Sequence, residues 1–165
     1  ALAGTTVTGI TQGITMADQW RVTSNFTFSS SGADIASNLS RVNTSGQGTL
    51  GTGMTESSGI FTFPSTGIYK VESTLTFLVG TATAWIFSVI KATTDNSSYN
   101  NVAGTFTGHS SGYYLNSHTS TLVDVTDTSN VKVKFHLDTD QGSSTVHANS
   151  AINYSFFTFT RLGDT

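Results

Sequence analysis

Residues 57–77 have the sequence SSGIFTFPSTGIYKVESTLTF, which predicts a short strand, a sharp turn and a long strand. The first apolar run ends at Pro64, because proline has no N–H to give to a sheet, and Gly67 gives the backbone the freedom to turn. Beyond the turn, apolar and polar residues alternate as they do in a strand with one buried face. We expect the buried side chains to be Tyr69, Val71, Leu75, Phe77 and Val79, with Lys70, Glu72, Thr74 and Thr76 facing outward.

The composition of the 165 residues favours an all-β protein with no membrane or nucleic-acid partner. Aromatic residues make up 11% and charged residues only 10%, and the abundant threonine and serine suit pleated, half-exposed strands. The net charge of −3 provides no basic field for nucleic acid. Cysteine is absent, which excludes disulfides, thiolate zinc sites and a cysteine nucleophile. No apolar run reaches the roughly 18 residues that span a bilayer, so we expect no membrane insertion.

The rest of the chain divides into an arm and one domain. Residues 1–13 are small and polar with few apolar side chains, which indicates a flexible arm that is either disordered or attached to a neighbouring surface. Residues 14–165 carry the strand patterns and are expected to form a single domain. The further expected strands are 20–28, 35–42, 84–90, 102–107, 113–125, 131–137 and one or two within 145–162.

Two of these strands have large apolar side chains on both faces. Residues 84–90 are almost continuously apolar, and in the last strand Tyr154 and Phe156 point opposite to Phe157 and Phe159. In a two-sheet sandwich, the second apolar face must be covered by something other than the core of the domain. The pattern therefore predicts an interface between subunits formed by Trp85, Phe87, Tyr154, Phe156, Phe157 and Phe159.

The corner between the two central strands resembles the signature of the C1q/TNF-like jelly rolls, Phe-x-x-Pro-x-x-Gly-x-Tyr. Phe61, Pro64, Gly67 and Tyr69 fit it, the segment YSFFTFTRL at 154–162 resembles the aromatic last strand of that family, and 120–133 resembles a strand–turn–strand unit without its usual Gly-Asp. The resemblance extends over about residues 20–162. It implies a jelly-roll β-sandwich of about eight to ten antiparallel strands and a compact homotrimer packed around aromatic residues.

No arrangement of residues predicts catalysis, a metal or a cofactor. Asp138 and Asp140 followed by Gly142 are similar to the start of a calcium loop, but the distant glutamate is missing, and aspartate is also common in turns. There is no Gly-x-Ser-x-Gly nucleophile elbow. The histidines form no closely spaced pair that favours a metal site over a structural role; they are His109, His118, His136 and His147. We therefore expect a protein that is not an enzyme.

Three tyrosines are candidates for recognition. Tyr99, Tyr113 and Tyr114 lie in stretches rich in Asn, Ser and Gly, where a flat ring can stack on a ligand and amides can hydrogen-bond. Ordinary polar loops with this composition look the same, so a sugar- or protein-binding surface and a plain loop both remain open.

Two segments resemble a pattern in structural proteins of marine phages: ITMADQWRV at 14–22 and GTGMTESSGIFTFPSTG at 51–67. The resemblance implies a non-enzymatic protein of the virion surface, a trimer that decorates or cements the capsid or forms a head fibre. Thr5, Val7 and Ile10 of the arm would then contact the major capsid protein. The alternative is a receptor-binding tip, carried on the shaft of a tail fibre, that recognises host surface glycan. A free lectin-like module is a third possibility.

Overall fold

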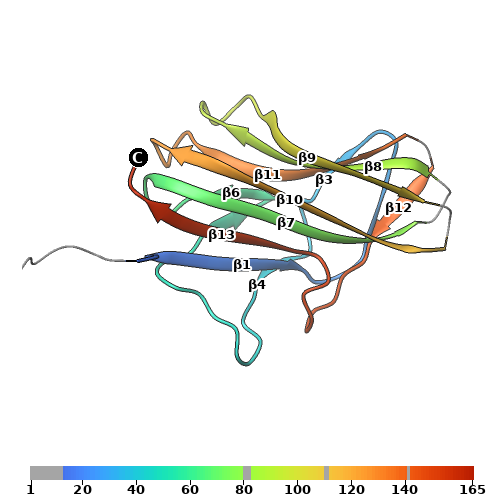
Figure 1. Cartoon of the computed structure of the whole chain (residues 1–165), viewed down its shortest axis with the longest axis horizontal. Coiled ribbons are helices and arrows are strands. Elements are labelled where there is room, and N and C mark those ends of the chain that lie inside the picture. Colours follow the sequence, from blue (N-terminus) through green and yellow to red (C-terminus); the bar gives the residue numbers. More distant parts are fainter. Residues whose placement is uncertain (1–12, 80–82, 110–111, 141) are drawn as a thin grey trace, which may run out of the picture.

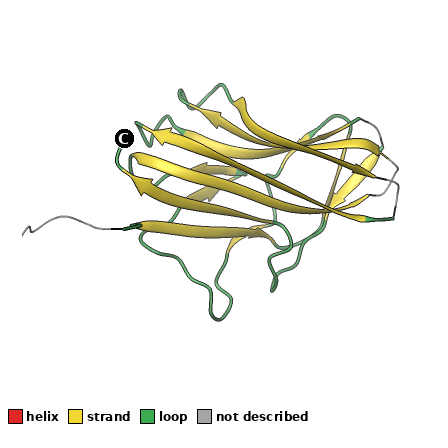
Figure 2. Ribbon diagram, in the orientation of Figure 1, coloured by secondary structure: helices red, strands yellow, loops and turns green. Residues whose placement is uncertain are grey.

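The computed structural model describes residues 13–165, apart from 80–82, 110–111 and 141. Within these ranges the chain forms thirteen strands, and Figure 2 shows only strands and loops. No helix in the described ranges has the length and apolar character needed to cross a membrane. The strands form two antiparallel sheets that face each other across a common core (Figure 1).

The first sheet, sheet A, is built on the long central strand β7. β10 pairs with β7 along the whole of one side, whereas the other side of β7 is shared by β13 and β12. β1 and β4 continue the sheet beyond β13, and β2 continues it beyond β12. The strands of sheet A are β1 (Met16–Val22), β2 (Phe26–Ser29), β4 (Leu39–Arg41), β7 (Gly67–Val79), β10 (Tyr114–Val125), β12 (Ser143–Val146) and β13 (Phe156–Gly163).

The second sheet, sheet B, has the strand order β5-β6-β11-β8-β9, and β3 also pairs with β11. β9 is the edge strand beside β10 of sheet A (Figure 1). The strands of sheet B are β3 (Ala33–Asp34), β5 (Thr55–Ser57), β6 (Ile60–Thr62), β8 (Thr83–Thr93), β9 (Asn100–His109) and β11 (Lys132–Thr139).

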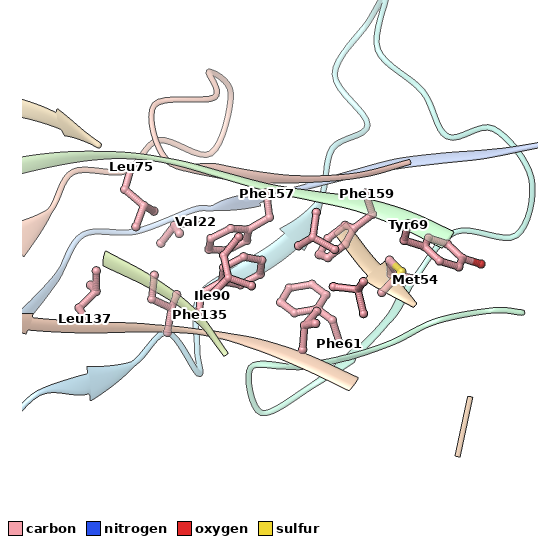
Figure 3. Close-up of a cluster of buried hydrophobic side chains, with 14 of the residues drawn as sticks. Val22, Met54, Phe61, Tyr69, Leu75, Ile90, Phe135, Leu137, Phe157 and Phe159 are labelled. Carbon is pink, nitrogen blue, oxygen red and sulfur yellow. The ribbon is translucent and has the colours of Figure 1, made fainter. Parts of the chain in front are cut away.

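The core lies between the sheets and is rich in aromatic rings. Phe157 and Phe159 of sheet A extend toward Phe61 and Phe135 of sheet B (Figure 3), and all four are at most 1% exposed. The rings of Phe135 and Phe157 are stacked, with centroids 3.7 Å apart and planes 9° apart. Burial of such large rings, with favourable ring pairing, supplies most of the stabilisation of a sandwich of this size.

The corner predicted from the sequence is confirmed. The apolar residues of β7 are buried in alternation, from Tyr69 to Val79. Gly67 has a φ of 140°, and a side chain there would meet the carbonyl oxygen of Gly163 at 2.5 Å. The hydroxyl of Tyr69 donates a hydrogen bond to the carbonyl of Ser65 (3.0 Å), which holds the turn against the start of β7.

Two expected strands are shorter than predicted. The expected strand 20–28 is divided, because β1 ends at Val22 and β2 begins at Phe26 beside a different strand. Between them the backbone N–H of Thr23 bonds to the carbonyl of Asn38 (2.7 Å) instead of continuing the ladder. In the expected strand 35–42, Asn38 has a φ of 58°, so only β4 is extended. The division of 20–28, together with the short strands β3 and β5 that the sequence did not predict, raises the strand number above the expected eight to ten.

A buried carboxylate fixes β1 to the loop that precedes β5. Asp18 is 1% exposed, and its oxygens accept hydrogen bonds from the guanidinium of Arg41 (3.1 Å) and the backbone N–H of Met54 (2.8 Å). The indole N–H of Trp20 (3.0 Å) and the hydroxyl of Thr49 (3.1 Å) donate to the same carboxylate. The loop 43–54, which has no strand of its own, is thereby held on the sandwich.

Candidate functional site

The histidines and acidic residues are dispersed. In the part of the chain that the structure describes, no three His, Asp or Glu side chains are grouped so as to hold a metal ion. His118 bonds to Thr74 on sheet A (3.1 Å), and Asp138 accepts a bond from the N–H of Thr139 (2.8 Å). The side chain of His109 lies outside the described residues. The candidate sites are therefore the outer faces of the sheets and the edge between them.

At that edge, β9 and β10 are joined through hydroxyl groups although they belong to different sheets. The hydroxyl of Thr105 donates to the carbonyl of His118 (2.9 Å), and Thr119 donates to Thr105 (3.0 Å). The buried hydroxyls of Ser88 and Ser117 share a hydrogen bond deeper in the edge. These contacts hold the middle of the sandwich closed.

Near the start of β9 the same edge opens into a groove of about 260 Å³. Its rim carries Val102 and Leu122, which are 46% and 63% exposed. Such exposure of branched apolar side chains beside a groove is typical of an interaction surface. The lining residues are Ala92, Thr93, Thr94, Val102, Leu122, Val123, Asp124 and Val131.

The outer face of sheet A combines threonines with a group of aromatic rings. His147 lies between two tyrosine rings, 4.9 Å from Tyr114 and 5.0 Å from Tyr154. Phe156, at the start of β13, is half-buried, and its register partner on β7 is Thr74. This face is therefore neither strongly charged nor fully covered by the chain itself.

The outer face of sheet B carries a second aromatic group. Phe87 and Phe106 are stacked, with centroids 4.2 Å apart, and Trp85 meets Phe106 edge to face at 5.7 Å. Phe106 is 63% exposed. Gly104 makes the arrangement possible, because a Cβ atom there would lie 2.4 Å from the ring of Phe87. The aromatic group thus rests on the bare backbone of β9.

Further along the same face, a charged network surrounds Asp34. Its carboxylate bonds to Lys134 (2.7 Å) and to Nδ1 of His136 (2.6 Å). Burial alone would raise the pKa of Asp34. The hydrogen bonds and charges of Lys134 and His136 outweigh that effect and hold the pKa below its usual value. Lys134 also lies 4.6 Å from the ring centre of Tyr99. Burial, followed by the charges of Asp34 and Asp95, raises the pKa of the Tyr99 phenol.

The six aromatic residues predicted to form one interface do not share a surface. Phe157 and Phe159 are 0% exposed in the core of the same chain, so their assignment to an interface is wrong. The physical reason is that these two positions of β13 face sheet B, which already covers them. Trp85 and Phe87 lie on sheet B, whereas Tyr154 and Phe156 lie on the side of sheet A.

The other predicted site residues are also separated. Tyr99 lies in the loop before β9, whereas Tyr113 and Tyr114 lie where β10 begins, at the opposite end of the sandwich (Figure 1). Tyr113 is 56% exposed and Tyr114 is 59% exposed. Thr5, Val7 and Ile10 of the arm lie outside the described residues. The sequence reasoning missed Phe106 and Leu122, whose positions depend on pairings that only the structure gives.

Comparisons with known proteins show the fold and nothing finer. No family model and no curated protein sequence matches the chain. Among solved structures, it resembles an Eiger TNF from S. frugiperda, with a TM-score of 0.68 and 12% identity over 91% of this chain and 94% of that one. It also resembles murine APRIL at pH 5.0, with a TM-score of 0.65 and 11% identity over 89% and 98% of the two chains. The chain has a C1q/TNF-like jelly-roll fold.

Proposed function

We propose that this chain is a non-enzymatic, homotrimeric protein of a phage virion surface that decorates or cements the capsid or forms a head fibre. The observation that carries the assembly is the apolar groove at the β9/β10 edge, with Val102 and Leu122 exposed at its rim. An uncovered apolar edge of this kind is stabilised by burial against a second copy.

Two apolar surfaces of the chain are available for a cyclic assembly. One apolar surface is an edge of the sandwich, whereas the second is the outer face of sheet A around Tyr154 and Phe156. When two different surfaces of one molecule meet, the contact is heterologous and closes into a ring if the rotation fits. A ring of three copies is the assembly that the resemblance to C1q/TNF-like domains implies.

Attachment to a capsid is supported by the phage-like segments at 14–22 and 51–67 and by the uncharged arm 1–13. A trimer would match a local threefold axis of the shell, and the arm would contact the major capsid protein. The threonine-rich, weakly charged exterior also suits a protein exposed on a particle surface.

A co-sedimentation experiment tests the capsid role. Undecorated phage capsids are mixed with the purified chain, with a variant that lacks residues 1–13, and with no addition. We expect the full chain to pellet with the capsids and the truncated variant to stay in the supernatant. A full chain that stays in the supernatant, or a truncated one that pellets equally well, contradicts attachment through the arm.

The second candidate function is a receptor-binding tip of a tail fibre. It is favoured by the aromatic group of Trp85, Phe87 and Phe106 on sheet B, because exposed flat rings are suited to stacking against a ligand. In that role the trimer would join a fibre shaft and contact glycan on the host surface. A chain that ignores capsids but binds host cells supports this candidate.

A further inference from the structure

Two lysines differ from the other Lys and Arg side chains of the protein in their contacts. Within the described ranges, Lys91 and Lys132 are the Lys or Arg side chains that make neither an ion pair nor a hydrogen bond. Lys70 pairs with Glu72, Lys134 with Asp34, Arg41 with Asp18 and Arg161 with Asp164, while Arg21 donates to Ser150, Thr44 and Gln47. In a chain of net charge −3, unpaired cations are scarce, and their position therefore indicates where an anion would be attracted.

The register of sheet B brings these two lysines together on its outer face. Lys91 of β8 is directly opposite Lys134 of β11, and Lys132 is opposite Thr93, one step away along the diagonal. Diagonal neighbours of this kind are separated by about 7–8 Å. Their neighbours Ile90, Val133 and Phe135 point into the core, so the lysines point away from it.

Like charges directly opposite each other across two strands are unfavourable. Asp34 neutralises Lys134, but within the described ranges no carboxylate pairs with Lys91 or Lys132. Lys91 and Lys132 are diagonal neighbours, and an anion placed between their ammonium groups would be attracted by both. The face thus presents two cationic side chains that no carboxylate of the described residues pairs with.

The aromatic group lies on the same face of the same strand. Trp85, Phe87 and Lys91 are at alternate positions of β8 that face outward, and Phe106 stacks on Phe87 from β9. Phe87 and Lys91 are four positions apart, a distance of roughly 13 Å at about 3.3 Å per residue. Asn101, opposite Lys91, adds an amide to the cationic part, whereas Asp138, opposite Phe87, places a carboxylate beside the aromatic part.

We propose that the outer face of sheet B binds an acidic polysaccharide. Lys91 and Lys132 hold a sulfate or carboxylate group, and Phe106, supported by Phe87 and Trp85, stacks against a neighbouring sugar ring. The proposal rests on the second candidate function, glycan recognition, and specifies its site and ligand class. A polysaccharide suits this face better than a nucleic acid, because nucleic-acid sites contact many phosphates with many cations. Among the described residues, the unpaired lysines number two.

Calorimetric titration of the full chain at low salt tests this site. The probes are a sulfated heparin hexasaccharide, an oligogalacturonate of equal length, neutral maltohexaose and a single-stranded DNA oligonucleotide. We expect one or both acidic sugars to bind, with an affinity that falls as salt rises, and the neutral sugar to bind much more weakly. The two acidic probes distinguish sulfate from carboxylate as the anion. No binding of either acidic sugar, or tighter binding of the DNA, overturns the proposal.

Variants distinguish a specific role of Lys91 and Lys132 from a general effect of the charge of the protein. The double variant Lys91→Gln/Lys132→Gln should weaken acidic sugar binding by about tenfold or more and flatten its salt dependence. The matched control is Lys70→Gln, a lysine on sheet A that should leave the affinity unchanged. Phe106→Ser should also weaken binding, because it removes the exposed ring. If the double variant and Lys70→Gln behave alike while host cells are still bound, this site is wrong and glycan recognition stands.

Discussion

Replacing Phe157 by alanine should lower the free energy of unfolding by about 3–5 kcal/mol, the range for large aromatic residues in cores. Phe157 is 0% exposed, stacks on Phe135 at 3.7 Å and meets the edge of Phe61 at 5.9 Å. Phe157 is one of the side chains that join the two sheets in the core (Figure 3), and alanine there would leave a cavity. The measurement is denaturant unfolding of both proteins at one fixed protein concentration.

Phe106→Ala is the matched control for this substitution. Phe106 is also stacked on a phenylalanine at 4.2 Å, but it is 63% exposed on the outer face of sheet B. Its replacement should lower the free energy of unfolding by about 1 kcal/mol or less, since little buried apolar area is lost. Equal losses in the two variants would contradict the assignment of Phe157 to the core and would restore it as an interface candidate.

Replacing Asp18 by alanine should lower the free energy of unfolding by about 3 kcal/mol or more, which is the second large effect that we expect. The carboxylate is buried and accepts bonds from Arg41, Trp20, Thr49 and the N–H of Met54. Without it, the buried N–H of Met54 has no acceptor, and the guanidinium of Arg41 loses its counterion. Loss of these bonds should also release the loop 43–54, which hydrogen exchange of the amide of Met54 would report.

The control for Asp18→Ala is Asp164→Ala. Asp164 pairs with Arg161 at 2.5 Å, but its side chain is 93% exposed. Exposed ion pairs contribute about 0–1 kcal/mol, so this variant should unfold almost as the original protein does. If Asp18→Ala unfolded at the same denaturant concentration as Asp164→Ala, the hydrogen bonds of Asp18 would not contribute to the stability of the fold, contrary to this prediction.

The central fold could be predicted from the sequence because its determinants are local. The proline, the glycine and the period of two in 57–79 lie within one stretch, and each has a direct steric or hydrogen-bonding cause. The same holds for β11, where Val133 and Phe135 are buried and Lys132 and Lys134 face out as expected. Alternation gives the two faces of a strand, whichever strand lies beside it.

The candidate surfaces depend on contacts between distant strands, and these could not be predicted. Alternation showed that β13 has two apolar faces, but not that sheet B of the same chain covers Phe157 and Phe159. Lys91 lies opposite Lys134 in the β8–β11 ladder, and Phe87 lies opposite Phe106 in the β8–β9 ladder, which also contains register shifts. A shift of the pairing register by one residue would move each of these side chains to the other face of the sheet.

We propose different roles for the two sheets of the sandwich. In the proposed assembly, the β9/β10 edge and sheet A would hold the copies together, and sheet B would remain open to a ligand. The proposed assembly would cover the groove beside Leu122, which is exposed in the single chain.

Sedimentation equilibrium of the full chain in solution tests that assembly most directly. The chain has a mass of 17.4 kDa, and we expect a single species of three times this mass across a wide range of protein concentrations. A species of 17.4 kDa throughout that range would contradict the assembly, and a stable dimer would contradict its ring geometry.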